Sequence, residues 1–287
     1  MSASDPSKLT EAYHGNCHCG AFRFHVVLPV LSMVPLTSCK CSICHRKGYL
    51  RVYPQSKNLV VERDELGLAS YQFGDGMVRH KFCPRCGTGV MDTVAESIGC
   101  PDIGINVRAF VDVDIWSLKI REVKGRADTN PYQPPGFSGT LPKASDPNLK
   151  LYTGSCHCGA VTLAVRTRPL PEINILEDNC SICQRNAYTI LELPPDQVSI
   201  IGTENTTSYE FGTKFQEHHF CSTCGVSVYI RVKEEIDDGF ETWPEERKQK
   251  VRENQGKVPI NIRVLNDVEW EQLKIERIDE NEGYSVG

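Results

Sequence analysis

Three cysteines lie close together in the first part of the chain, at Cys39, Cys41 and Cys44. A structural zinc site in a protein is normally closed by four ligands, whereas a zinc with three protein ligands keeps its fourth position open, as catalytic sites do. Three thiolates offset the charge of the metal, so such a centre activates water weakly and suits a soft incoming ligand such as another thiolate. The cluster therefore predicts a zinc centre that accepts a small thiol.

Two pairs of cysteines flank this cluster, and both pairs recur in the second half of the chain. Because only the outer pairs are complete in both halves, we assign them to one closed four-cysteine zinc site in each half. The alternatives are buried free thiols or a redox dithiol, but no thioredoxin-like βαβ pattern surrounds them. The predicted ligands are Cys17, Cys19, Cys83 and Cys86 in the first half, and Cys156, Cys158, Cys221 and Cys224 in the second.

The centre of the second half carries Asp178 where the first half has Cys39, followed by Cys180 and Cys183. Two interpretations remain open for this position. Asp178 either binds zinc through oxygen together with the two cysteines, which makes a harder ligand set, or the two thiols are a remnant without metal. In the first half, Cys100 is the alternative fourth ligand that would make the central site structural.

Basic side chains accompany the central cluster of the first half. Arg46 follows it directly, and a guanidinium presents a bidentate fork for a carboxylate, so the pattern fits a small acidic thiol, with Lys47 as a second anchor. Bond formation at such a thiol needs a proton donor, for which we expect His45 or His80. His80 recurs as His218 in the second half, which also fits a shared structural role.

The two halves repeat the same short motifs in the same order. Gly-x-Cys-His-Cys-Gly occurs at 15–20 and at 154–159, and Ile-Asn followed by Val or Ile and then Arg occurs at 105–108 and 260–263. Collinear motifs over more than about 100 residues indicate a tandem duplication.

The duplication predicts a first zinc domain at 10–125, a proline-rich linker at 126–148 and a second zinc domain at 149–280. The second domain contains an insertion at 234–256 that is dense in Glu, Lys and Arg. We expect a solvated surface helix there. A lid over the site of the first repeat is the alternative.

Both repeats have the local pattern of strands rather than helices. Apart from the insertion, helix is scarce: one short helix is expected near Asp112 and its counterpart near Asp267, where an acidic residue can cap the helix start. His18 and His157 lie between cysteines of segments expected to be extended, which predicts exposed imidazoles. The fold class is therefore mainly β, with two tandem zinc-stapled domains and few short helices. Alternating apolar and polar residues, bounded by Gly, Pro and Asp, predict strands at 21–26, 49–53, 58–62, 88–92, 160–165 and 198–201.

Composition narrows the class of protein. The chain has 287 residues, 40% of them hydrophobic, and a net charge of −5, so nucleic acid is not an expected partner. It has 14 cysteines but a polar N-terminus without an apolar signal segment, which favours metal ligands in a cytoplasmic or nuclear protein over secreted disulfides. No apolar run is long enough to span a membrane. The sequence does not determine whether the protein is a monomer or a homodimer.

Taken together, these motifs resemble the family of glutathione-dependent formaldehyde-activating enzymes, also called the centromere protein V family. The resemblance runs through 14–120 and 153–275 and includes Cys-x-Cys-Ser-x-Cys-x-Arg, Tyr-x-Phe-Gly and His-x-Phe-Cys-x-x-Cys-Gly. It implies two zinc-stapled β-tent domains and a carbon–sulfur lyase that makes or breaks S-hydroxymethylglutathione.

The resemblance also implies the roles of the cysteines. It assigns the outer pairs to structural zinc and the central cluster of Cys39, Cys41 and Cys44 to a labile catalytic zinc that responds to glutathione. Two features depart from the family pattern, namely the fusion of two domains and the presence of Asp178 in the second. The leading hypothesis is a lyase with its active site in the first repeat. The alternative is a tandem zinc scaffold for protein interaction.

Overall fold

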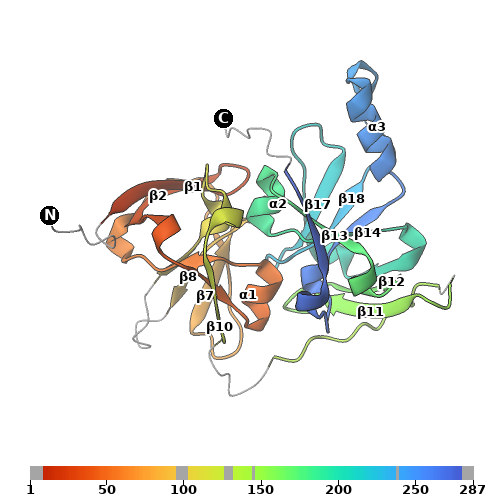
Figure 1. Ribbon diagram of the computed structural model, residues 1–287, viewed down its shortest axis with the longest axis horizontal. Coiled ribbons are helices and arrows are strands. Elements are labelled where there is room, and N and C mark those ends of the chain that lie inside the picture. The colour runs from red at the N-terminus through yellow and green to blue at the C-terminus, as the bar shows by residue number, and fades with distance from the viewer. Residues whose placement is uncertain (1–8, 95–102, 126–131, 144–145, 237–238, 280–287) are drawn as a thin grey trace. The chain divides into compact units, whose positions relative to one another are not determined.

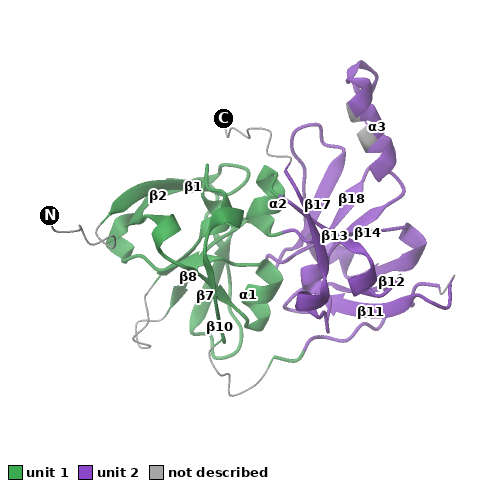
Figure 2. Cartoon of the chain, in the orientation of Figure 1, with its two compact units in different colours: residues 1–133, 179–187, 280–287 green, residues 134–178, 188–279 purple. Residues whose placement is uncertain are grey.

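The computed structural model describes residues 9–94, 103–125, 132–143, 146–236 and 239–279 (Figure 1). The chain forms two compact units, shown in Figure 2. Unit 1 comprises Met1–Gln133, Asn179–Ala187 and Glu280–Gly287, and unit 2 comprises Pro134–Asp178 and Tyr188–Asp279. The prediction of a mainly β chain is confirmed, because each unit contains one three-stranded and one seven-stranded sheet.

Unit 1 is built on two sheets whose strands come from the first repeat. The smaller sheet has the order β1 (Thr10–Asn16), β2 (Phe22–Pro29) and β5 (Leu59–Asp64), all antiparallel. In the larger sheet only β10 and β3 pair in parallel. Its order is β10 (Ile120–Val123), β3 (Leu36–Cys39), β4 (Arg51–Val52), β9 (Ile103–Asn106), β8 (Gly89–Val94), β7 (Val78–Phe82) and β6 (Ala69–Tyr71).

Strand β2 shows why these segments form sheets. Its side chains alternate between buried and more exposed, because successive residues of a strand point to opposite faces. Phe24 is fully buried and its ring lies 5.9 Å from that of Phe110, which in turn stacks on Tyr13 at 5.6 Å. This aromatic cluster forms the core between the three-stranded sheet and the chain that continues from β9.

The repeated Ile-Asn-Val-Arg motif connects the core to the centre of unit 1. Asn106 is buried, donates from Nδ2 to the carbonyl of Gly89 at 2.7 Å and accepts from the amide of Leu50 at 3.3 Å. Arg108 donates from Nε to the carbonyl of Gly48 at 2.7 Å. The motif therefore holds β8 and the segment around Gly48 in place, which is a structural role.

Two short helices begin within the central clusters, each containing the last cysteine of its cluster, and the sequence analysis did not predict them. Helix α1 (Ser42–Lys47) ends at Gly48, which has a left-handed φ of 55°. Helix α2 (Ser181–Asn186) ends at Ala187 with a φ of 52°, a conformation that costs a non-glycine residue about 1–2 kcal/mol. Helix α2 belongs to the second repeat in sequence but lies in unit 1 (Figure 2).

Unit 2 repeats the two-sheet arrangement. Its smaller sheet has the order β11 (Lys150–Ser155), β12 (Thr162–Thr167) and β15 (Val198–Ile201). The larger sheet has the order β16 (Thr206–Tyr209), β17 (Gln216–Cys221), β18 (Ser227–Val232), β19 (Val258–Asn261), β14 (Ile190–Leu193), β13 (Asn174–Asp178) and β20 (Lys274–Ile278).

Only a short 3₁₀ turn, and no α-helix, lies near each of Asp112 and Asp267, and neither residue begins it. Both residues have left-handed backbone, with φ of 56° and 55°, which interrupts a right-handed helix. A single 3₁₀ turn lies shortly after each of them, at Ile115–Ser117 and Trp270–Gln272. The first turn is capped by Asp114, whose Oδ1 accepts from the amide of Trp116 at 3.0 Å.

The insertion of the second repeat forms helix α3 (Glu245–Asn254), which projects from unit 2 in Figure 1. Val251 and Lys248 are buried, and the other helix side chains that the structure describes are exposed or half-buried. The described parts of the linker, 132–143 and 146–148, have no helix or strand. Pro142 is buried there, and its carbonyl accepts from Nε of Arg166 at 2.9 Å, so the linker packs on unit 2. None of the described helices is long and apolar enough to cross a membrane.

Candidate metal centres

The outer cysteine pairs of the first repeat come together at one end of unit 1. Cys17 and Cys19 lie in the turn after β1, and Cys83 and Cys86 lie in the turn between β7 and β8. Cys19 Sγ lies 3.6 Å from Cys17 Sγ and 3.6 Å from Cys83 Sγ. A tetrahedral zinc with Zn–S bonds of about 2.3 Å needs sulfurs about 3.8 Å apart, so the four thiols fit zinc.

The second repeat forms an equivalent tetrad in unit 2. Cys158 Sγ lies 3.6 Å from Cys156 Sγ and 3.5 Å from Cys221 Sγ, and Cys224 completes the group. Hydrogen bonds from the neighbouring thiols, Cys156 first, lower the pKa of Cys221 far below its ordinary value. The described cysteines form no disulfides, so the sulfurs of both tetrads are free to act as metal ligands.

The central cysteines of the first repeat form a separate group of three. Cys39 ends β3, and Cys41 and Cys44 lie at the start of α1, with Sγ atoms 3.0 Å apart. The three Sγ atoms lie within 4.8 Å of one another. Hydrogen bonds from Cys41 and Cys44 lower the pKa of the Cys39 thiol, with a further contribution from the charge of Arg51. A Cβ at Gly125 would lie 2.6 Å from Cys41 Cβ, so the chain after β10 passes closely over this group.

A buried ion pair lies beside the central cysteines. Arg51 on β4 donates from Nη1 to Cys44 Sγ at 2.9 Å, and its Nε pairs with the carboxylate of Asp92 on β8. Both side chains are less than a tenth exposed. A Cβ at Gly104 would lie 2.6 Å from Asp92 Oδ1, so glycine is needed there to make room for the carboxylate. The ion pair places a permanent positive charge against one sulfur of the cluster.

His80 completes this polar group. It lies opposite Asp92 in the pairing of β7 with β8, and its ring stacks between Tyr49 and Phe73 at centroid distances of 6.0 Å each. Its Nδ1 lies 3.5 Å from Nη2 of Arg51. A guanidinium only donates, so Nδ1 is the acceptor and Nε2 carries the proton of the neutral imidazole.

The family of glutathione-dependent formaldehyde-activating enzymes has a sequence model that matches residues 12–117 and 151–240. The two segments contain the two outer tetrads and both central clusters. The chain belongs to this family. The resemblance of the motifs to this family is thereby confirmed, and the match to two segments agrees with a tandem duplication.

Individual relatives share part of the chain. A putative glutathione-dependent formaldehyde-activating enzyme of Halomonas elongata is 36% identical over 90 residues, which are 28% of this chain and 55% of the relative. The match thus spans about half the length of that curated relative. A crystal structure of a Rhodobacter sphaeroides protein is 24% identical and covers 44% of this chain and 99% of its own, with a TM-score of 0.34.

Within this family member, Arg51 and Asp92 are polar residues that the sequence analysis missed. Neither belongs to a repeated motif, because the second repeat has Ile190 opposite Asn261 where the first has Arg51 opposite Asn106. Likewise Ile230 lies opposite His218 where Asp92 lies opposite His80. The difference between the repeats at these two positions is the sequence feature that would have revealed the pair.

The other predicted residues of the first repeat lie on or near α1. Arg46 is buried on this helix, and its guanidinium lies over the ring of Tyr132 at 5.1 Å. Lys47 is buried with Nζ 4.9 Å from the ring centre of Phe82. His45 is half-buried on the same helix. Cys100, the alternative fourth ligand, lies outside the described residues.

The prediction that His18 and His157 are exposed is wrong, since their residues are 0% and 2% exposed. Both lie in tight turns, and the amide of Gly20 bonds back to the carbonyl of Cys17 at 2.9 Å, so the alternation of an extended strand does not apply. His18 Nε2 lies 3.0 Å from Ser181 Oγ on α2.

Helix α2 contacts both turns of the unit 1 tetrad. Arg185 donates from Nε and Nη2 to the carbonyl and side-chain oxygens of Asn16, at 3.2 and 3.1 Å. Asn186 donates to the carbonyl of Cys86 at 3.1 Å. Arg185 occupies the motif position of Arg46, so one motif residue has different surroundings in the two repeats.

The central cluster of the second repeat keeps a possible ligand set. Oxygen and sulfur atoms of Asp178, Cys180 and Cys183 lie within 4.8 Å of one another. Its surroundings differ from those of the first repeat. His218 is 2% exposed, and neither ring nitrogen has a hydrogen-bond partner among the residues that the structure describes. Burial lowers the pKa of His218 to about 3, so it is neutral.

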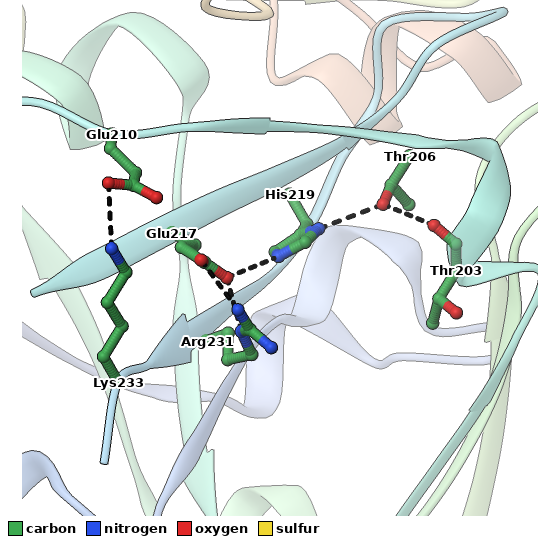
Figure 3. A network of polar contacts seen from close by, with 7 residues as sticks. All are labelled: Thr203, Thr206, Glu210, Glu217, His219, Arg231 and Lys233. Atoms are coloured by element: carbon green, nitrogen blue, oxygen red, sulfur yellow. Dashed lines mark hydrogen bonds and ion pairs between the residues drawn. The ribbon is translucent and has the colours of Figure 1, made fainter. Parts of the chain in front are cut away.

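Unit 2 has a polar network of its own, shown in Figure 3. Glu217 accepts from Nη2 of Arg231 at 2.7 Å and lies 3.4 Å from Nε2 of His219, whose Nδ1 is 3.0 Å from Oγ1 of Thr206. These residues join β16, β17 and β18. A groove of about 760 Å³ next to the network has no cysteine among its lining residues. We assign the network a structural role.

Proposed function

We propose that this protein is a zinc-dependent carbon–sulfur lyase of the formaldehyde-activating type, with its active site at the central cysteines of the first repeat. The substrate class is an adduct of glutathione or a similar acidic thiol with formaldehyde or another small aldehyde. In the forward direction the thiolate sulfur bonds to the carbonyl carbon, and the carbonyl oxygen takes up a proton. Cleavage returns that proton and releases the thiolate and the aldehyde.

The observation that carries the proposal is the group of three thiols without a fourth cysteine among the described residues of the cluster. Three thiols close together, with one Sγ hydrogen-bonded to Arg51, fit a metal that keeps one position for a further ligand. A zinc ion held by Cys39, Cys41 and Cys44 would supply a binding position for a soft thiolate sulfur.

The side chains around the cluster have separate proposed roles. Arg51 lowers the negative charge that three thiolates accumulate, so a fourth, anionic sulfur is tolerated next to them. Tyr49 and Phe73 fix the ring of His80, and its Nε2–H is the proposed hydrogen-bond donor to the adduct oxygen, while the proton that this oxygen gains is the one that the thiol releases to solvent on becoming a thiolate.

Arg46 is the proposed anchor for a carboxylate of the thiol. A guanidinium that stacks on a ring, as Arg46 does on Tyr132, keeps its N–H groups in its own plane, where a carboxylate binds. Lys47, which lies against Phe82, is the second proposed cation.

For the second repeat we propose a supporting role without lyase activity. Asp178 replaces one thiol, and isoleucines stand in the places of Arg51 and Asp92. The zinc tetrad of unit 2 would stabilise that unit, while the central cluster of the second repeat would bind metal more weakly or not at all.

The test uses substitutions at the two central ligand sets. Cys39→Asp gives the first repeat the ligand set of the second. We expect it to lower the zinc content by one equivalent and to reduce the glutathione-dependent turnover of formaldehyde by more than about 100-fold, beyond the usual cost of losing an outer-shell partner. The matched control, Asp178→Asn, changes the second repeat only and should leave turnover unchanged.

Zinc content and circular dichroism are measured on the same preparations, so that loss of folding is recognised. Wild-type turnover and zinc content in Cys39→Asp would refute an active site at this cluster. Loss of turnover in Asp178→Asn alone would move the site to the second repeat.

A further inference from the structure

A second kind of metal-ligating group lies on the three-stranded sheet of unit 1. It consists of His14 on β1, His25 on β2 and Glu62 on β5, and it contains no sulfur. One ligand atom from each residue lies within 4.8 Å of the other two. The side chains of His14, His25 and Glu62 are 66%, 31% and 40% exposed, so the group faces solvent.

The strand pairing explains why these side chains meet. His14 is directly opposite His25 in the antiparallel pair of β1 and β2, so both imidazoles project from the same face of the sheet. The rings lie 5.6 Å apart. On the other side of β2, the register shifts between Phe24 and Arg23, whose partners are Val61 and Arg63.

Glu62 is therefore the extra residue of a β-bulge, and bulges re-aim a side chain. Here the carboxylate turns toward both histidines. Glu62 Oε1 lies 2.7 Å from Nδ1 of His25 and 3.8 Å from Nδ1 of His14. Two imidazole nitrogens thus converge on one carboxylate oxygen.

We propose that His14, His25 and Glu62 bind a divalent first-row transition metal ion, with Zn²⁺ as the reference ion. Two imidazoles and a carboxylate are an established zinc ligand set, and three protein ligands leave the solvent side open to water. The distances require only side-chain rotation, because metal bonds of about 2.0–2.2 Å bring ligand atoms to roughly 3.3 Å from one another. This site is independent of the cysteine clusters and of the proposed lyase activity.

The second repeat supplies an internal comparison. Its strands β11 and β12 have the same register, but Thr153 and Ala164 stand opposite each other in place of the two histidines. Strand β15 pairs with β12 without a register shift, so there is no bulge residue in the place of Glu62. All three ligands are therefore features of unit 1, and unit 2 has the same sheet without the site.

The competing explanation is a surface hydrogen bond between His25 and Glu62, which is worth only about 0–1 kcal/mol and needs no metal. The two explanations differ in the role of His14. A simple pair of His25 and Glu62 does not involve His14, whereas a metal site needs all three residues.

The experiment uses the full chain with its cysteine sites already loaded with zinc and dialysed free of excess metal. Isothermal titration with further Zn²⁺ should show one additional equivalent in the wild type. His14→Ala and Glu62→Gln should each weaken this binding by at least about 10-fold, and His14→Ala with His25→Ala should abolish it. Glu11→Gln is the matched control, because it removes an exposed carboxylate from the same sheet that bonds to Tyr13 and does not belong to the group of His14, His25 and Glu62.

Imidazole ¹H–¹⁵N spectra of the same samples track the two histidines during the titration. Shifts of His14 and His25 that saturate at one equivalent support the site. Absence of an additional equivalent in the wild type, or the same equivalent with unchanged affinity in the double histidine variant, would overturn the proposal. Binding that depends on His25 and Glu62 but not on His14 would also overturn it.

Discussion

Arg51 donates a hydrogen bond from Nη1 to Cys44 Sγ at 2.9 Å while its Nε pairs with Asp92, so a buried cation links a sulfur of the central cluster to a buried carboxylate. Burial raises the pKa of Asp92, and the guanidinium of Arg51 opposes that shift. The second repeat replaces this pair with Ile190 and Ile230. The chain thus contains the same scaffold with and without the charge pair.

Arg51→Ile should destabilise unit 1 by about 3–5 kcal/mol, because it leaves Asp92 buried without its partner. Arg51→Ile with Asp92→Ile copies the second repeat and should recover most of that stability. Urea unfolding at a constant zinc concentration measures the stability of the single and the double variant. The double variant should still hold its central zinc about 10–100-fold more weakly, as seen by competition with a chelator. Equal stability of the single and double variants would contradict the role assigned to the pair.

The two tetrads should stabilise their own units separately. Cys86→Ser should remove one zinc and destabilise unit 1, and Cys224→Ser should do the same for unit 2, since a closed thiolate site contributes roughly 10 kcal/mol of binding free energy to folding. Hydrogen exchange resolves the two units within one sample. Protection lost in both units from either single substitution would refute this independence.

Stability of unit 2 should depend on pH through His218. Burial lowers the pKa of His218 from 6.5 to about 3. Between these two pH values the unfolded chain binds a proton on this imidazole and the folded chain does not. The contribution of the neutral imidazole to the free energy of unfolding is complete above about pH 6.5 and decreases as the pH falls toward 3. At pH 5 the loss is about 2 kcal/mol.

His218→Phe removes this group, so the difference in unfolding free energy between variant and wild type should change by about 2 kcal/mol between pH 7.5 and 5. Acid release of zinc affects both proteins and cancels in the difference. A difference that stays constant with pH would show that His218 titrates normally.

Helix α2 should stabilise the zinc tetrad of unit 1. Arg185→Ala removes the hydrogen bonds to Asn16 and should cost about 1.5–3 kcal/mol, the range for buried bonds to a charged donor. It should also speed zinc release from the tetrad, measured with a chromogenic chelator. Arg277→Ala removes an exposed arginine and serves as control, with an expected cost below about 1 kcal/mol. Identical release rates in the two variants would contradict a stabilising role for α2.

Strand positions illustrate how much of the fold can be predicted from local pattern. Segments 198–201 and 58–62 were predicted as strands and correspond to β15 (Val198–Ile201) and β5 (Leu59–Asp64), because alternation and bounding turn residues act locally. The six-residue helix α1 was missed, since it is too short for a helical period to be recognised. Asp112 was expected to cap a helix but adopts left-handed backbone instead.

The sequence by itself determined the three cysteine groups and the duplication, because metal affinity depends on ligand type and spacing, and because two copies in one chain can be compared directly. The tertiary structure decided which other residues surround these groups. Arg51, Asp92 and His80 meet through the pairing of β4, β9, β8 and β7, and Glu62 reaches two histidines through a bulge. Such contacts depend on strand register across long stretches of chain, so a local pattern does not contain them.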